Sequence, residues 1–450
     1  MGHSLEMSTL TTAEPQPESP PAGPEPPPAE TAKVVRIVWR AFWTSRLVVL
    51  LSGMFAVLQF GLQTGWQGFD PFRLTTPFGY FGNLLVAPSA RWDSVWYLEI
   101  AHFGYRHQLG RTAFFPLYPG LIHVVGVVIG SDLAAGILIS LVCFAVALFL
   151  LYQLVLLDAS PEIAETTVVL LAFAPMAFFF SAVYTESLFL MLSVGCILQA
   201  RRGRWWAAGV LGGLAAASRN GGVLLIVPAA ILFLYGPRAD LAARATRWAA
   251  VERSRLRTLL PRYRLSPQVL WLALIPAGIA AYLIYTAITA GNWLDPFHAE
   301  QLWYHHTTTP FTGAWDGAVA AWDGLRQLIH GPAPPVYFQL SGGDPLLEAG
   351  QNLMLFSFLV VGLIACIGVF REQPFAYGAY TLLGLALPLS SPIVPQPLSS
   401  LPRYLMVLFP MFIWAAGLLV RRRLTTQGIA AAAVLLGVFT AEFATWRWVA

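Results

Sequence analysis

The chain has 450 residues, of which 57% are hydrophobic and 11% are charged, and its formal net charge is +4. Soluble domains carry about 25% charged residues, so this composition excludes an ordinary soluble domain and indicates a protein embedded in a bilayer. The three cysteines stand alone in apolar stretches without a CxxC spacing, which argues against a disulfide framework or a thiolate metal site.

The first 32 residues are rich in Pro, Glu, Ser and Thr and poor in bulky apolar side chains. Such a segment cannot bury enough apolar surface to offset its ordering entropy. We therefore expect a disordered tail over residues 1–32, followed by a polytopic membrane domain over residues 33–450. The tail lacks the short apolar core and small-residue cleavage site of a secretory signal.

Apolar stretches of membrane-spanning length follow along the chain. A helix needs about 20 apolar residues to cross the hydrocarbon layer, so we predict an all-α polytopic bundle of about eleven transmembrane helices. The predicted spans cover residues 46–64, 133–157, 163–181, 184–200, 205–218, 221–236, 269–290, 351–370, 374–391, 403–420 and 427–446. The short pair around Ser218–Gly222 could be a hairpin of thin or tilted helices, or a pair that does not fully cross.

A polar and aromatic segment, Ala90–Pro119, lies between the first two predicted spans. It is too polar to lie in lipid and belongs at the water interface, where aromatic side chains gather. We expect interfacial helices in this first outer loop, one of them over residues 116–130, where the apolar stretch is short and contains Pro116 and Pro119.

The arginines among the loops predict one orientation. Loop 237–268 contains eight arginines, whereas loop 291–350 contains one arginine and six acidic residues. Because cytoplasmic loops are enriched in Arg and Lys, we expect the tail and loop 237–268 inside, and loops 65–132 and 291–350 outside. The arginine-rich loop is expected to set the topology and contact anionic headgroups; the alternative is a specific ligand site.

Asp93 is the first candidate for chemistry. It lies two residues after Arg91 and between Trp92 and Trp96. A carboxylate can accept a proton from an attacking hydroxyl if it reaches hydrogen-bonding distance; the alternative roles are a surface pair with Arg91 or a helix N-cap. Glycoside hydrolysis uses two carboxylates, whereas transfer from a sugar phosphate needs only a base for the acceptor and cations for the departing phosphate.

Arginine suits such a phosphate because it offers paired donors. The outer candidates are Arg91, Arg106, Arg111, Arg219 and Arg403. Arg403 begins a predicted membrane helix near the outer surface, where it could instead be a snorkelling anchor.

Glu186 lies at the outer end of a predicted span. An ionisable group this close to the apolar layer usually faces protein or a watery cavity. The alternative is an acid at a helix N-terminus that the helix dipole stabilises.

The histidines do not indicate a metal site. None of three pairs has a typical ligand spacing: His102 with His107, His305 with His306, and His298 with Glu300. We therefore expect no cofactor, with a divalent metal as the alternative. The tryptophans of the second outer loop favour interfacial anchoring over stacking on sugars: Trp293, Trp303, Trp315 and Trp322.

The sequence RWDSVWYLEIAHFGY at residues 91–105, followed by AFFPLYPGLI, resembles the phosphatidylinositol-glycan class V (PIG-V) mannosyltransferases. This family belongs to the GT-C superfamily of membrane glycosyltransferases. Three further stretches follow in the family's order: Tyr184–Ser187, Ser218–Arg219 shortly before a glycine, and Pro402–Tyr404 before a late helix. The resemblance spans about residues 40–420.

The resemblance implies a GT-C-like fold and an inverting transfer of mannose from a polyprenyl- or dolichyl-phosphate donor to a hydroxyl on the outer face of the membrane. Asp93 would be the catalytic base. The substrate-binding residues would be Arg91, Trp92, Trp96, Tyr97, Glu186, Arg219, Arg403 and Tyr404. The acceptor stays open between a lipid, a glycan and a protein, because loop Gly291–Pro296 matches the family only loosely.

Two other hypotheses stay open. A lipid-linked sugar flippase or transporter would place ionisable groups near the membrane midplane, whereas here they collect at one surface. A non-catalytic subunit could position a lipid substrate. The proline-rich tail and the arginine usage point to a bacterial cell membrane, with membrane lipids but no nucleic acid as partners.

Overall fold

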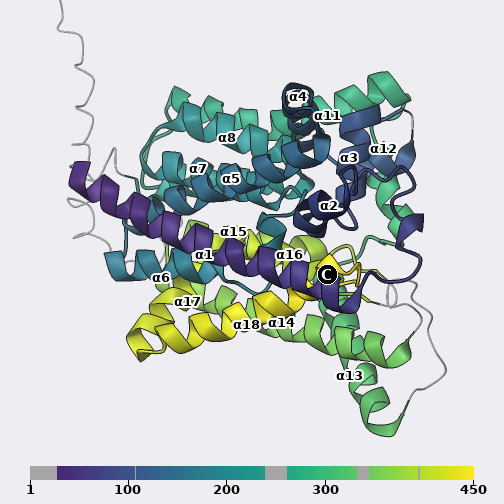
Figure 1. Cartoon of the computed structure of the whole chain (residues 1–450). Helices are drawn as coiled ribbons and strands as arrows, with labels where there is room; N and C mark the ends of the chain where they lie inside the picture. Colours follow the sequence, from purple (N-terminus) through teal and green to yellow (C-terminus); the bar gives the residue numbers. More distant parts are fainter. Residues whose placement is uncertain (1–27, 107, 239–260, 332–343, 394–395, 450) are drawn as a thin grey trace, which may run out of the picture.

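The computed structural model describes residues 28–106, 108–238, 261–331, 344–393 and 396–449 (Figure 1). The regular elements of these residues are helices, and a single pairing of extended backbone joins His305 to Ile393. The α-helices are α1 (Pro28–Phe60), α2 (Tyr80–Val86), α3 (Ser94–Phe103), α4 (Leu117–Ile129), α5 (Asp132–Val155), α6 (Pro161–Ala172), α7 (Glu186–Arg201), α8 (Trp205–Ser218), α9 (Ile226–Tyr235), α11 (Leu274–Ala290), α12 (Asp295–Ala299), α13 (Pro310–His330), α14 (Pro345–Glu372), α15 (Phe375–Leu389), α16 (Leu401–Met406), α17 (Phe409–Arg422) and α18 (Thr425–Ala444). Short 3-10 segments include η3 (Leu109–Ala113), η4 (Ala177–Phe180), η5 (Asn220–Leu225), η9 (Pro267–Ala273) and η10 (Glu300–Trp303).

Five helical stretches of the described chain are long and apolar enough to cross a membrane. They are Thr31–Phe60, Asp132–Val155, Pro267–Thr289, Pro345–Glu372 and Thr425–Ala444. Each coincides with a predicted span, so the all-α, membrane-embedded class is confirmed. The other predicted spans also contain helices, but these are shorter, and the total number of crossings stays a prediction.

Prolines interrupt two of the predicted spans. The helix expected over residues 163–181 ends at Ala172, ahead of Pro175, and the one expected from Arg403 is split between α16 and α17, ahead of Pro410. Proline lacks an N–H, its ring clashes with the carbonyl four residues earlier, and the residue before it avoids the helical region. The prediction of one continuous helix over residues 403–420 is therefore wrong, and Arg403 lies on the short helix α16.

The helices of the predicted first outer loop are present, whereas their place at the membrane interface stays a prediction. The expected helix over residues 116–130 is α4, and α3 and η3 precede it. At the N-terminus, α1 begins at Pro28, a few residues before the predicted tail ends. The rest of that tail, and residues 239–260 of the arginine-rich loop, lie outside the described residues.

The short helices are held together by close packing. Helix α7 packs between α5 and α8, α8 packs on α11, and α1 runs alongside α18 (Figure 1). Glycines allow the close contact of α8 with α11: a Cβ atom added at Gly213 would lie 2.6 Å from the carbonyl oxygen of Leu274, and one added at Gly278 would collide with the carbonyl of Gly213. Small residues of this kind are typical of helix packing in membranes.

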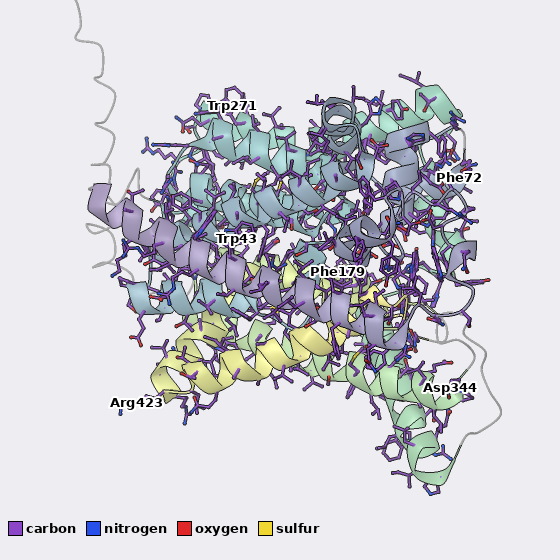
Figure 2. All side chains as sticks on the ribbon, viewed as in Figure 1. Trp43, Phe72, Phe179, Trp271, Asp344 and Arg423 are labelled. Carbon is purple, nitrogen blue, oxygen red and sulfur yellow. The ribbon has the colours of Figure 1, made fainter. Side chains whose placement is uncertain are left out.

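The charged ends of the bundle are far apart. Arg423, at the turn between α17 and α18, and Asp344, at the start of α14, lie at opposite ends of the molecule (Figure 2). The predicted cytoplasmic turn and the predicted outer loop are thus separated along the length of the helices, as a single orientation in the membrane requires. The α3 and α12 region shares the end of the molecule that carries Phe72 (Figures 1 and 2).

Candidate active site

Asp93 stands at the N-terminal end of α3, where the chain turns sharply. Trp92 has a φ of 54°, in the left-handed region. The hydroxyl of Tyr184 holds this turn, because it accepts a hydrogen bond from the Asp93 backbone N–H at 3.1 Å and donates one to the Arg91 carbonyl at 3.2 Å. The Asp93 carboxylate does not cap α3, so the alternative role of an N-cap is excluded.

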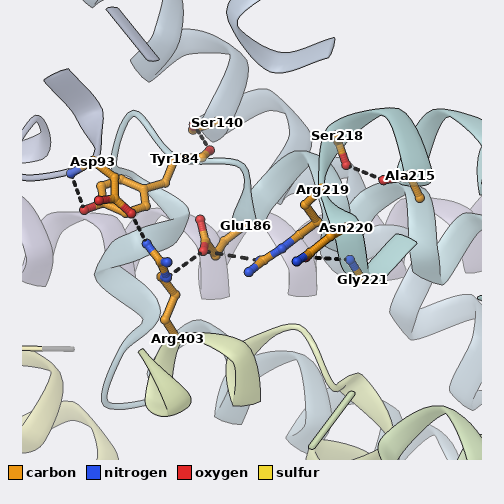
Figure 3. A network of polar contacts seen from close by, with 10 residues as sticks. All are labelled: Asp93, Ser140, Tyr184, Glu186, Ala215, Ser218, Arg219, Asn220, Gly221 and Arg403. Carbon is orange, nitrogen blue, oxygen red and sulfur yellow. Dashed lines mark hydrogen bonds and ion pairs between the residues drawn. The ribbon is translucent and has the colours of Figure 1, made fainter. Parts of the chain in front are cut away.

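The Asp93 carboxylate is instead the first member of a row of alternating charges (Figure 3). Arg403 donates from Nη1 to Asp93 Oδ2, and its Nε lies 3.4 Å from Glu186 Oε1. Arg219 Nη1 lies 3.4 Å from the same oxygen of Glu186. The row therefore contains two carboxylates and two guanidinium groups, which come from four separate parts of the chain.

Burial makes this alternation necessary. The Glu186 side chain is 1% exposed and that of Arg219 is 10% exposed. An ionised group in the protein interior costs several kcal/mol unless a partner of opposite charge compensates it. One oxygen, Glu186 Oε2, has no hydrogen-bond partner within the described part of the chain. The row is thus balanced in charge but keeps one buried acceptor open.

Each of the two guanidinium groups lies over the face of an aromatic ring. The Arg219 guanidinium lies 4.4 Å from the ring centre of Tyr404, and that of Arg403 lies 5.5 Å from the ring centre of Tyr184. Such cation–π contacts stabilise a cation without neutralising its charge.

A small apolar cleft, open on one side, adjoins Arg219. It lies between α7, η5, α15 and α16, and Arg219 is the charged residue of its lining. The other lining residues are Phe189, Gly221, Leu224, Tyr380, Gly384, Leu387, Tyr404, Val407 and Leu408. An apolar cleft that ends at a cation suits an amphiphile with an anionic head.

Arg91 and Trp92 face away from this row. Arg91 Nε donates to the carbonyl of Ala444 at 2.9 Å, and Trp92 Nε1 donates to the carbonyl of Arg447 at 3.3 Å. Burial lowers the pKa of Arg91 to about 9, against the opposing influence of the Asp70 carboxylate. Both side chains join the outer segment to the end of α18, and no surface pair of Arg91 with Asp93 forms.

Trp96 and Tyr97 line the space on the other side of Asp93. The ring of Trp96 stacks on Phe114, with centroids 5.8 Å apart. Tyr97 is buried, and burial, with the carboxylates of Glu186 and Asp93, raises its pKa. Its hydroxyl therefore stays protonated.

The remaining outer arginines have local structural partners. Arg111 forms a buried ion pair with Glu99 at 3.0 Å, and Arg106 Nε donates to the carbonyl of Phe103 at 2.8 Å. Among the tryptophans of the second outer loop, Trp303 packs on Trp96 with ring centroids 5.5 Å apart. The other three are exposed on the surface: Trp293, Trp315 and Trp322.

Two further groups reach the site without having been predicted. Glu300 Oε2 lies 3.7 Å from His305 Nε2, and His305 Nδ1 lies 2.6 Å from the Ser391 carbonyl oxygen. In the sequence these residues are candidates only for metal binding, and their spacing gives no signal for another role. Within the described ranges, no group of three or more His, Cys, Asp or Glu side chains could hold a metal ion.

Comparison with known proteins supports the resemblance seen in the sequence. A family model described as mannosyltransferase (PIG-V) matches residues 35–235. This part of the chain is thus similar to the PIG-V mannosyltransferases. The matched part contains Asp93, Glu186 and Arg219, whereas Arg403 lies beyond it.

Curated relatives agree with the family model. GPI alpha-1,6-mannosyltransferase 2 of Rattus norvegicus is 31% identical over 36% of this chain and 35% of the relative. The same-named protein of Homo sapiens is 27% identical over 36% of this chain and 35% of the relative. The matches cover about a third of the length of these relatives. All are animal proteins, so they lend no support to a bacterial source.

Solved structures give a weaker likeness. A crystal structure of the Archaeoglobus fulgidus oligosaccharyltransferase is 15% identical, covers 90% of this chain and 55% of that chain, and has a TM-score of 0.41.

Proposed function

We propose that the protein is an inverting glycosyltransferase that moves mannose from a polyprenyl- or dolichyl-phosphate donor to a hydroxyl acceptor. The observation that carries the proposal is the row Asp93–Arg403–Glu186–Arg219, which ends at an apolar cleft. The row puts a carboxylate at one end and an anion site at the other. The PIG-V match over residues 35–235 supports the same reaction class.

Asp93 acts as the general base in this proposal. Its carboxylate takes the proton of the acceptor hydroxyl while the acceptor oxygen forms a bond to the anomeric carbon of mannose. The bond from that carbon to the phosphate oxygen breaks, and the prenyl phosphate leaves with the electron pair. Attack opposite the leaving group inverts the anomeric centre. Asp93 is 22% exposed and Glu186 1%, so Asp93 is the carboxylate that an outside acceptor can reach.

Arg219 and Arg403 bind the donor phosphate and stabilise the charge that grows on it as it leaves. Arginine binds phosphate oxygens through paired, charge-assisted hydrogen bonds. Preorganised cations of this kind contribute most when they are held in a site that excludes water. The prenyl chain lies in the cleft next to Arg219, among Phe189, Leu224 and Leu387.

Glu186 holds the two arginines at the spacing that the phosphate needs. With one oxygen shared by both guanidinium groups, it keeps them together despite their mutual repulsion. In the proposal, its unpaired atom Oε2 accepts a hydrogen bond from a hydroxyl of the bound mannose.

The site faces the outer side of the membrane in this proposal, with the N-terminus in the cytoplasm. The relatives are named as GPI alpha-1,6-mannosyltransferases. A glycolipid is therefore the acceptor that we favour over a glycan or a protein. Because the polar row lies at the end of the bundle, a glycolipid headgroup could reach Asp93 from the membrane surface.

The decisive experiment is Asp93→Asn in the purified full-length protein. Transfer of labelled mannose from polyprenyl-phosphate-mannose should fall at least about 100-fold, because general-base catalysis contributes about 10²–10⁴-fold. Asp323→Asn is the matched control, since this outer-loop aspartate is exposed and pairs only with exposed Arg326. Near-normal transfer by Asp93→Asn would refute the role of Asp93. Scrambling of labelled lipid without sugar transfer would favour a transporter.

A further inference from the structure

The segment after α12 is fixed to the loop that leads into α16. His306 donates from its backbone N–H to the Pro392 carbonyl at 3.3 Å, and Thr308 donates to the Ser390 carbonyl at 2.9 Å. The loop continues into α16, which carries Arg403. The second outer loop is thus hydrogen-bonded to the same stretch of chain that supplies a cation to the site.

The same segment also packs on the first outer loop. The ring of Trp303 lies edge-on to Trp96, with centroids 5.5 Å apart, and to Phe114, at 5.8 Å. Trp96 is one turn along α3 from Asp93. The segment that contains Glu300 is therefore held between the two elements that carry Asp93 and Arg403.

His305 holds the Glu300 carboxylate. Its Nδ1 lies 2.6 Å from the Ser391 carbonyl, which can only accept, so this nitrogen carries a proton. The other nitrogen, Nε2, lies 3.7 Å from Glu300 Oε2. The imidazole therefore lies between the Ser391 carbonyl and the Glu300 carboxylate.

The carboxylates of the site differ in how far they are open to solvent. The exposed fraction of the side chain falls from 38% at Glu300 to 22% at Asp93 and 1% at Glu186. Glu300 is thus the most exposed of the three carboxylates. Such a carboxylate repels a phosphate but accepts hydrogen bonds from hydroxyl groups.

We propose that Glu300, held by His305, is the acceptor-binding carboxylate of the site, which accepts a hydrogen bond from a second hydroxyl of a sugar or polyol acceptor. This inference rests on the proposed glycosyl transfer. One hydroxyl bound at Glu300 leaves a neighbouring hydroxyl directed toward Asp93. The acceptor class is therefore a polyhydroxylated headgroup with at least two hydroxyls, and not a lone serine or threonine.

Glu300 also gives the site a pH dependence of defined sign. Burial raises the pKa of the Glu300 carboxyl group. The charged groups that face it act in both directions: His305, Arg403 and Arg219 oppose the rise, and Asp93 adds to it. A protonated carboxyl group accepts hydrogen bonds poorly, so the KM for the sugar acceptor should rise as the pH falls. Because the pKa of Glu300 is raised, this rise should begin at a pH above the usual glutamate pKa of about 4.3.

The test separates donor cleavage from transfer. The purified full chain is given polyprenyl-phosphate-mannose with labelled sugar, and slow hydrolysis by water is measured without an acceptor. Transfer is then measured to octyl α-mannoside as a hydroxyl-rich probe. Glu300→Gln should raise the KM for the probe about tenfold, as expected for the loss of one charged hydrogen bond, and change donor hydrolysis less than about twofold.

Conservative and second-site variants complete the design. Glu300→Asp should restore part of the affinity, and His305→Gln should weaken it by displacing the carboxylate. The acid-side rise in KM should disappear in Glu300→Gln. An equal loss of hydrolysis and transfer in Glu300→Gln would overturn the inference in favour of a structural role. Absence of donor cleavage by the native chain would instead overturn the proposed function.

Discussion

Two arginine–carboxylate clusters lie at opposite ends of α7, and they are built differently. We refer to them as the inner cluster, at the end predicted to face the cytoplasm, and the outer row, at the end predicted to face outside. At the inner end, Arg201 forms two hydrogen bonds to Asp158, at 2.6 and 2.7 Å, and a third to the Tyr377 hydroxyl at 2.8 Å. At the outer end, both arginine contacts to Glu186 are 3.4 Å long. The contacts of Arg201 with Asp158 are short and forked, whereas the two contacts to Glu186 are long and only the contact of Arg403 with Asp93 is close.

The difference is the one expected between a structural ion pair and the proposed binding site. A forked arginine–carboxylate pair uses the donors of the guanidinium and the oxygens of the acid on each other. In the outer row, Glu186 Oε2 is left open and an apolar cleft adjoins Arg219. In the proposed function, Arg219 and Arg403 exchange their long contacts to Glu186 Oε1 for contacts to the donor phosphate. The ligand can then bind and leave without unfolding the residues around it.

Of the changes that follow, removal of Arg403 should reduce the rate of mannose transfer most. In Arg403→Gln, Asp93 and Glu186 lose their common cation, and the donor phosphate loses a partner. We expect mannose transfer to fall by about 10²–10³-fold, as for other removed transition-state donors. Single-turnover transfer would measure it. Arg403→Lys keeps the charge but not the fork, and recovery of the full rate in that variant would contradict phosphate binding by paired donors.

The matching change in the inner cluster is Arg201→Gln. It leaves Asp158 and Tyr377 without their cation, so the protein should be destabilised by about 2 kcal/mol, less than for a fully buried pair because Asp158 is 39% exposed. Thermal unfolding in detergent would measure this loss. Transfer by the folded fraction should stay within about twofold of the native rate. A hundredfold loss of transfer in Arg201→Gln would show that the inner cluster also takes part in the reaction.

The sequence identified the members of the outer row but not their arrangement. Asp93, Glu186, Arg219 and Arg403 were all named from motifs and local chemistry, and the structure joins them. Arg91 and Trp92 were named for the same reason, but the left-handed φ of Trp92 turns them toward α18. Adjacency in sequence gives no direction to a side chain.

The sequence likewise predicts where the long helices lie better than where the short helices begin and end. Apolar length located the five long spans because hydrocarbon thickness fixes how many residues a helix needs. It could not show that Pro410 would separate α16 from α17. Glu300 was missed because its place depends on the hydrogen bonds between Thr308 and Ser390 and between His306 and Pro392, which join distant segments.

Blocking the apolar cleft beside Arg219 should weaken binding of the donor moderately and leave the rate of the chemical step unchanged. Leu387→Trp places an indole in the apolar cleft beside Gly221, where the prenyl chain is proposed to lie. We expect the KM for polyprenyl-phosphate-mannose to rise about tenfold with kcat little changed, as for a loss of ground-state binding. Leu382→Trp, at an exposed position of α15, is the control. An unchanged KM in Leu387→Trp would place the chain elsewhere.

The smallest effect should come from Tyr184→Phe. The ring that supports Arg403 stays, but the hydroxyl that joins the Asp93 N–H to the Arg91 carbonyl is lost. The turn at Trp92 should loosen and misplace the Asp93 carboxylate, so we expect kcat to fall about three- to tenfold, with the donor KM unchanged, because a small displacement of a catalytic group mainly slows the chemical step. Tyr377→Phe removes the corresponding hydroxyl from the inner cluster and should leave kcat unchanged. If both variants lost activity equally, general loosening of the bundle would explain the loss; if only Tyr184→Phe did, the tyrosine would be a positioning residue for Asp93.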